Sequence, residues 1–256
     1  ATSSRGRASR AGLPRGPARP PAGGGRALSR FLEVVWAVVE KDLRLERRAK
    51  ESLVMMLVFS LLVLTLFSFA FGPGGGPGGE PGAAQAGILW VAFLFASVVG
   101  LSRSMGVERE SEGFAAMRLS PADPAALFLG KMLSILALMG VMELAGFAAL
   151  AVLYRAPVGR AAGELALVAA AATVGIASVG TLFAAMSVRT RTREVLLPVL
   201  MFPLLVPVLI AAVRGTAAFL GGKGWAEAAD WLRLLVVYDV VFVVASALMF
   251  EFVIAE

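Results

Sequence analysis

The stretch GILWVAFLFASVVGLSRSMGVERESEGFAAMRLSPADP, residues 87–124, places an apolar segment directly before a cluster of charges. The apolar segment extends back to Ala83 and predicts a membrane span over residues 83–102. Pro121 stops any helix in the charged cluster, and a further apolar segment follows it at once. The charged cluster is too short for a domain, so we expect a small connecting helix at one face of a membrane.

The charged cluster has the features of a short helix that another protein could contact. Acidic residues stand at its amino end and a basic residue near its carboxyl end, which suits the helix dipole. Phe114 and Met117 lie three residues apart, so they share one helical face and offer an apolar contact. A solvated connector without a partner is the alternative interpretation. The candidate contact residues are Glu108, Arg109, Glu110, Glu112, Phe114, Met117 and Arg118.

Composition places the whole chain in the membrane class. Of its 256 residues, 58% are hydrophobic and 16% are charged, and the mean hydropathy is +0.80; soluble domains carry about 25% charged residues. The sequence contains neither cysteine nor histidine. Zinc sites, disulfides and Ser-His-Asp or Cys-His catalytic groups are therefore excluded within this chain, and we expect no metal site and no catalytic residue.

Six apolar segments are long enough to cross a bilayer, so the sequence predicts an all-α membrane protein with six transmembrane helices. Residues 1–30 are basic and rich in Pro and Gly, which favours a disordered tail. As a helix, residues 31–51 would place apolar side chains on one face and charged side chains on the other. This pattern, with Trp36 in the segment, is typical of a helix lying on a membrane surface. Residues 52–256 form the six-span domain. The predicted spans are residues 53–71, 83–102, 125–154, 165–188, 195–213 and 232–254.

The distribution of positive charge predicts the orientation of these spans. Most of the 24 Lys and Arg residues fall on the same side of the membrane as the amino terminus. By the positive-inside rule, both termini and the charged cluster are cytoplasmic. The net charge of +6 is concentrated at membrane edges, so we expect a lipid surface and no nucleic acid as its partner. Lys131, early in the third span, is expected to extend back to the nearby interface.

Two carboxylates and three prolines interrupt the apolar spans. Glu143 lies near the middle of the third span and Asp239 lies in the sixth. An ionisable group at this depth is costly, so each predicts either a function or a hydrogen bond to another helix, including one of a partner subunit. The fifth span should be kinked or partly broken, either as a moving element or as a static kink. Its prolines are Pro198, Pro203 and Pro207.

Several segments in order resemble the haem exporter protein B family, CcmB. The resemblance covers residues 38–254 and implies an ABC-2-type permease, in which residues 31–51 are the elbow helix and residues 108–121 the coupling helix. Besides residues 87–121, the segments that carry it are KDLRLERRAKE (41–51), LFLGKM (127–132), LLPVLMFPLLVPVLIAAV (196–213) and WLRLLVVYDVVFVVASALMFEFVIAE (231–256).

The resemblance also implies partners and a cargo. The chain would be the membrane subunit of an ABC complex for cytochrome c maturation in the bacterial inner (plasma) membrane, coupling ATP hydrolysis to haem export or to haem release. The implied partners are a CcmA-like ATPase, CcmC-like and CcmD-like membrane subunits and the haem chaperone CcmE. The sequence has no Walker motif and offers haem iron no imidazole or thiolate. We therefore expect a permease subunit, not an enzyme, with ATP on a partner, haem as the cargo of the complex and no cofactor bound by this chain.

Other transport functions stay open at this stage. The same spans could form an ABC-2 permease for another cargo, such as a drug or a lipid. A proton-coupled secondary transporter could use Glu143 and Asp239, although such proteins usually show inverted repeats and none is evident between the halves. An intramembrane enzyme is the weakest interpretation, because no nucleophile-base pair is evident.

Overall fold

The computed structural model describes residues 24–72, 82–110, 122–187 and 193–255, and in these ranges all regular structure is helical. A short 3-10 helix, η1 (Val158–Ala161), precedes α6. The α-helices are α1 (Gly24–Ala49), α2 (Glu51–Phe71), α3 (Ala83–Glu110), α5 (Pro124–Leu153), α6 (Ala162–Ser187), α7 (Arg193–Leu220) and α8 (Trp225–Ala255).

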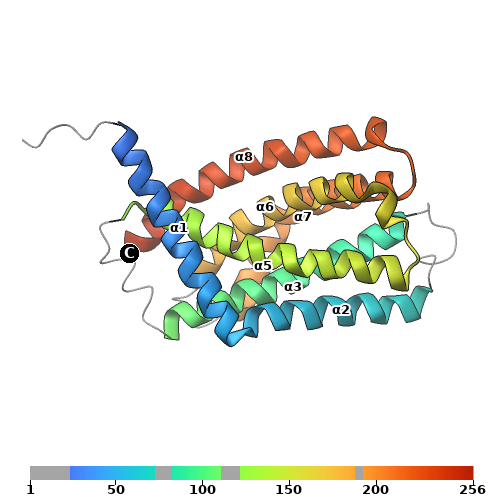
Figure 1. The fold of residues 1–256 in the computed structure, drawn as a ribbon, viewed down its shortest axis with the longest axis horizontal. Helices are drawn as coiled ribbons and strands as arrows, with labels where there is room; N and C mark the ends of the chain where they lie inside the picture. The colour runs from blue at the N-terminus through green and yellow to red at the C-terminus, as the bar shows by residue number, and fades with distance from the viewer. Residues whose placement is uncertain (1–23, 73–81, 111–121, 188–192, 256) are drawn as a thin grey trace, which may run out of the picture.

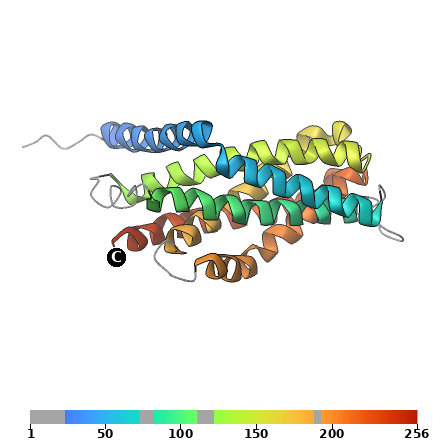
Figure 2. The same ribbon diagram turned by 90° about the horizontal axis from the view of Figure 1, so that it is seen from below.

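Six of these helices, α2, α3, α5, α6, α7 and α8, are long and apolar enough to cross a membrane. The shortest, α2, has 21 residues and is about 31 Å long at 1.5 Å per residue, close to the ~30 Å of a hydrocarbon core. The six helices run side by side along the long axis of the molecule, and α1 crosses one end of them (Figures 1 and 2). The predicted all-α, six-span fold is therefore confirmed.

The ends of the helices differ from the predicted spans where charged residues flank the apolar core. α7 continues to Leu220 and α8 begins at Trp225, so both extend several residues beyond the segments that hydropathy identified. A helix continues through polar residues once it leaves the bilayer, and hydropathy cannot mark that continuation. The start of α5 lies within one residue of the predicted span, residues 125–154: the Asp123 side chain accepts a hydrogen bond of 2.9 Å from the Ala125 N–H, and Pro124 occupies the first turn.

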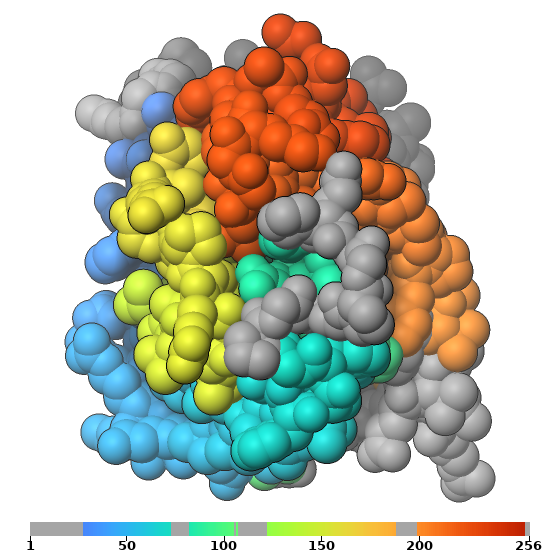
Figure 3. Space-filling view, turned by 90° about the vertical axis from the view of Figure 1, so that its right-hand side faces the viewer, coloured from blue at the N-terminus to red at the C-terminus, as the bar shows by residue number. Residues whose placement is uncertain are grey.

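α3 and α6 form the interior of the bundle, and α2 and α8 are its most exposed spans. An end view shows α2 and α8 on opposite sides of the molecule (Figure 3). Small residues permit the close contacts of the interior. A Cβ placed at Gly146 of α5 would lie 2.3 Å from the Phe93 ring of α3, and one at Gly180 of α6 would lie 2.3 Å from Leu101.

Hydrogen bonds inside the apolar bundle tie spans that are distant in sequence. The Trp90 indole N–H of α3 donates to the Thr216 hydroxyl of α7 at 2.9 Å. The Tyr154 hydroxyl, directly after α5, donates to the Leu64 carbonyl of α2 at 2.8 Å. Because lipid offers no alternative partner, such bonds help to specify which helices pack together.

We predict that Gly146→Ala destabilises the bundle while Gly140→Ala does not. Both glycines lie in α5, but a Cβ at Gly140 has no atom within 4 Å, whereas one at Gly146 overlaps the Phe93 ring. Overpacking of this kind costs about 1–3 kcal/mol. Thermal unfolding of the detergent-solubilised variants measures the difference, and equal midpoints for both variants would contradict the packing described here.

Candidate functional site

The predicted coupling segment falls largely outside the described residues. The α3 helix continues to Glu110, so Glu108, Arg109 and Glu110 belong to its last turns, where the sequence had placed the start of a separate short helix. Residues 111–121, which include Glu112, Phe114, Met117 and Arg118, are not described, and their role stays a prediction. The end of α3 and the start of α5 both lie at the end of the bundle that α1 crosses (Figure 1).

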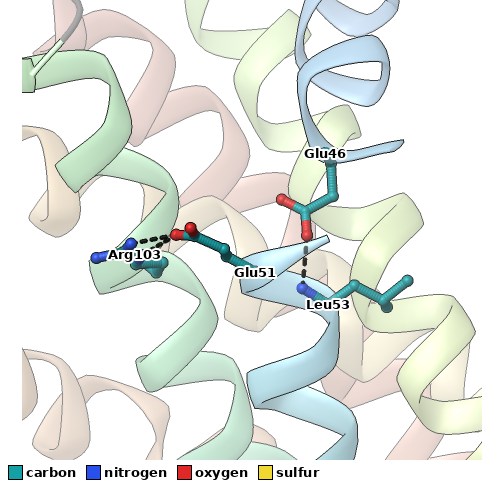
Figure 4. A network of polar contacts seen from close by, with 4 residues as sticks. All are labelled: Glu46, Glu51, Leu53 and Arg103. Atoms are coloured by element: carbon teal, nitrogen blue, oxygen red, sulfur yellow. Dashed lines mark hydrogen bonds and ion pairs between the residues drawn. The ribbon is translucent and has the colours of Figure 1, made fainter. Parts of the chain in front are cut away.

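The junction between α1 and α2 is a sharp turn held by one carboxylate. Lys50 adopts a left-handed conformation, with φ of 55°, and separates the two helices. The Glu46 side chain of α1 reaches across this turn and accepts a hydrogen bond of 2.7 Å from the Leu53 N–H (Figure 4). This N–H is one of the donors that a helix start leaves without an intrahelical partner. Glu46 therefore caps α2 from outside that helix and sets the angle of the elbow.

A second carboxylate ties the start of α2 to α3. Arg103 of α3 donates from Nε to Glu51 Oε2 at 2.9 Å, and its NH2 group contacts the same oxygen (Figure 4). Both side chains are partly exposed, so this pair is worth about 0.2–1 kcal/mol. Its main effect is to place the end of α3, which precedes the charged cluster, beside the elbow.

The contact between α1 and α5 is a buried ion pair that the sequence did not predict. Lys131 Nζ lies 2.8 Å from Asp42 Oδ2, with the two side chains 3% and 11% exposed. The expectation that Lys131 extends to the interface is wrong, because α1 covers the start of α5 and the ammonium meets a carboxylate instead of water. The helices are close here: a Cβ at Gly130 would lie 2.6 Å from the Cβ of Val38.

The apolar face of α1 is divided between protein and surroundings. Val35 and Val39 are buried in the protein, whereas Leu32 and Trp36 are 56% and 68% exposed. The amphipathic pattern of residues 31–51 had predicted a single apolar face for this helix. Trp36 and Leu32 therefore remain free to contact lipid, which favours the predicted position of α1 on the membrane surface.

A cavity of about 100 Å³, lined by both apolar and polar side chains, lies where α1, α2, α3 and α5 meet. Its carboxylates are already engaged, since Asp42 pairs with Lys131, Glu46 caps α2 and Glu51 binds Arg103. No group of three or more Asp or Glu side chains able to hold a metal occurs in the described ranges. The arrangement joins four helices at one end of the bundle. Its polar lining residues are Asp42, Glu46, Glu51, Ser52, Ser104, Lys131 and Ser134.

Glu143 is buried between α5 and α6 and is hydrogen-bonded within the chain. The Thr173 hydroxyl of α6 donates to its carboxyl group, and that hydroxyl also lies 2.7 Å from the Ala169 carbonyl. A hydroxyl has one proton, so it can donate to only one of these oxygens at a time. The geometry supports the interpretation of Glu143 as a helix-to-helix contact.

The structure does not bring Glu143 and Asp239 together. Glu143 contacts Thr173, whereas Asp239 of α8 lies against Gly175: a Cβ there would be 2.9 Å from Asp239 Oδ1. Positions 173 and 175 of one helix are about 200° apart around its axis. The helix α6 therefore separates the two carboxylates, and they form no direct proton relay.

The proline-rich span is a continuous helix. Pro198, Pro203 and Pro207 all lie inside α7, which runs from Arg193 to Leu220 without interruption. The structure therefore shows no break in this span, which was one of the two predicted possibilities. The helix does bend, since its first turns point in a different direction from the rest (Figure 2). At this level the Tyr238 hydroxyl of α8 donates to the Leu204 carbonyl at 3.0 Å. Whether α7 moves stays a prediction.

Comparison with known proteins identifies relatives over most of the chain. The family profile described as "CcmB protein" matches residues 33–255, which contain about two thirds of α1 and all six spans. A relative named heme exporter protein B, from Rhodobacter capsulatus, is 33% identical over 174 residues, covering 68% of this chain and 78% of the relative. A second protein of that name, from Bradyrhizobium diazoefficiens, is 27% identical over 186 residues, covering 73% and 82%.

We predict that Lys131→Met lowers the free energy of unfolding by on the order of 3 kcal/mol, because it leaves the buried Asp42 carboxylate without its main partner. Combining it with Asp42→Asn should restore part of this loss. Arg233→Met is the matched control, since Arg233 pairs with Asp230 on an exposed surface and such pairs contribute little. Thermal unfolding of the solubilised protein is the measurement, and similar effects of Lys131→Met and Arg233→Met would contradict the buried pair.

We also predict that Thr173→Val destabilises the protein by about 1–3 kcal/mol, because the similarly shaped side chain leaves the buried Glu143 carboxyl unsatisfied. Glu143→Leu added to Thr173→Val should recover stability, since no polar group of the pair then remains. Midpoints of chemical unfolding for the single and double variants test this coupling. Strictly additive losses in the double variant would show that the two side chains do not interact.

Proposed function

Because the chain belongs to the CcmB family, we propose that it is the transmembrane subunit of an ABC transporter complex for cytochrome c maturation. In this complex it couples ATP hydrolysis on a separate subunit to haem export or to release of haem to a chaperone. The observation that carries the proposal is the family match over residues 33–255, together with two relatives named heme exporter protein B. The partners we propose are a CcmA-like ATPase, CcmC-like and CcmD-like membrane subunits and the haem chaperone CcmE, in the bacterial inner membrane with both termini cytoplasmic.

The chain acts in this proposal as a mechanical transducer. It contains no histidine or cysteine to ligate haem iron and no Walker motif to bind ATP. Haem ligation and ATP hydrolysis are therefore assigned to partner proteins. Conformational coupling through the helices is what this subunit contributes.

The contacts at the end of the bundle that α1 crosses support a path for that coupling. Residues 111–123 connect α3 to α5, so a protein that moves this segment pulls on both helices. The elbow is joined to α5 by Asp42–Lys131 and to α3 by Glu51–Arg103. A displacement of α3 against α5 therefore also reaches α1 and α2.

The test of coupling is the double variant Phe114→Ala with Met117→Ala. We expect cytochrome c assembly in cells to fall by at least about tenfold, the effect of losing about 1.4 kcal/mol of contact, while the chain still inserts into the membrane. In the purified complex, ATP hydrolysis should continue without supporting assembly. Spectroscopy of covalently bound haem and an ATPase assay provide the readouts.

Val141→Ala with Leu144→Ala is the matched control. These two exposed apolar residues of α5 share the same three-residue spacing, but they lie within a membrane span. The control should leave assembly unchanged. Normal assembly in the Phe114/Met117 variant would refute the coupling assignment, and the absence of any ATPase co-purifying with the chain would refute the complex itself.

A further inference from the structure

The end of α1 that leads into the first span presents more positive charge to its surroundings than the sequence indicates. Residues 41–50 contain five Lys or Arg side chains, and residues 40–51 contain four carboxylates. By composition this segment is therefore close to neutral. The structure separates the two signs, because the carboxylates are engaged within the protein while part of the basic set is not.

Three of the four carboxylates serve the junction of the helices. Two of them are neutralised by cations from α5 and α3, in the pairs Asp42–Lys131 and Glu51–Arg103. Glu46 caps α2. These side chains hold the elbow together, so they are not part of the outward surface that α1 presents.

The fourth carboxylate, Glu40, pairs with Arg44 one turn along α1. Three basic side chains then remain at the end of the helix: Arg47, Arg48 and Lys50. All three are exposed, and their side chains have no ion pair or hydrogen bond among the described residues. The outward surface of this end of α1 is therefore positive.

The position of these three side chains along the chain sets their depth. Arg47 and Arg48 stand in the last turn of α1, and Lys50 forms the left-handed turn that leads into α2. The 21 residues of α2 only just cross a hydrocarbon core of about 30 Å. The residues that directly precede α2 therefore lie at the level of the lipid headgroups.

The exposed apolar residues of α1 face the same side as this basic end. Leu32 and Trp36 are both exposed. Arg47 follows Trp36 by 11 positions, which is about 20° beyond three full turns, so the two side chains share one side of the helix. Trp and Leu suit the boundary of the acyl chains, and a long arginine side chain can extend from there to a phosphate.

An anionic phospholipid fits this surface better than a zwitterionic one. Guanidinium groups bind phosphate oxygens through paired hydrogen bonds. The headgroup of phosphatidylcholine adds a cation beside its phosphate, and neighbouring arginines repel that cation. Phosphatidylglycerol has no such cation. Basic clusters directly before a membrane span commonly attract anionic lipids in this way.

We propose that the end of α1 binds anionic phospholipid, with Arg47, Arg48 and Lys50 on the headgroup phosphates and with Leu32 and Trp36 among the acyl chains. Lipid charge then holds at the membrane surface the elbow to which α2, α3 and α5 are tied. The inference goes beyond the proposed function and does not rest on it. It requires only that the six spans lie in a bilayer.

Native mass spectrometry of the full chain in detergent tests the proposal. Phosphatidylglycerol and phosphatidylcholine with identical acyl chains are titrated separately, and we expect the phosphatidylglycerol to bind at least about tenfold more tightly. Arg47→Gln with Arg48→Gln should weaken binding of the tightest phosphatidylglycerol about tenfold, which corresponds to ~1.4 kcal/mol, and leave phosphatidylcholine unchanged. Arg47→Lys with Arg48→Lys should keep the preference, because it keeps the charge. Glycerol phosphate should not displace the lipid, because it offers nothing to Leu32 and Trp36.

Arg160→Gln with Arg214→Gln is the matched control. These arginines are also exposed, but they lie at the opposite end of the bundle, in η1 and in the last turns of α7 (Figure 1). The control should leave the tightest phosphatidylglycerol in place. Basic residues in a last turn also favour the helix dipole, so thermal unfolding without added lipid establishes that the glutamine variant of α1 folds.

Three results would overturn the proposal. They are equal affinity for the two lipids, an equal loss of phosphatidylglycerol in the control, and unchanged phosphatidylglycerol binding in the Arg47/Arg48 glutamine variant. The last result is the one expected if the basic end of α1 binds an acidic surface of another protein instead of lipid.

Discussion

The constraint on which this structure depends is that polar groups inside the spans must find partners within protein, because a hydrocarbon core supplies none. Trp90 meets Thr216, the Tyr154 hydroxyl meets a carbonyl of α2, and Glu143 meets Thr173. The first two bonds join helices that are far apart in the sequence, and the third joins the consecutive helices α5 and α6. In a membrane bundle, lipid chains and most side chains are equally apolar. These few hydrogen bonds and the close contacts at glycines therefore distinguish one arrangement of the helices from another.

The same constraint shapes the end of the bundle that α1 crosses. Lys131 is in a position that would suit a side chain reaching for water, but α1 covers it and Asp42 neutralises it. Glu46 and Glu51 complete the junction by binding the start of α2 and the end of α3. Charged side chains thus connect four helices at the place where α3 and α5 lead into the charged segment, which fits the coupling role proposed above.

The two membrane carboxylates have different surroundings, which separates their roles. Glu143 has a hydrogen-bond donor inside the chain, the Thr173 hydroxyl of α6. Asp239 lies across α6 from it, at the edge of an apolar surface, and is left without a donor by the described residues. The separation weakens the idea of a proton path through both groups.

The sequence by itself determined the number of spans, the helical class and the amphipathic helix before the first span. All of these follow from local patterns, since bilayer thickness sets the length of an apolar helix and turn chemistry sets where it starts. Only the tertiary structure decided that Lys131 pairs with Asp42, that Thr173 serves Glu143 while Asp239 Oδ1 has no partner among the described residues, and that the apolar face of α1 is split between protein and surroundings. The physical reason is that every span is apolar on all sides, so no local pattern records which face meets another helix and which meets lipid.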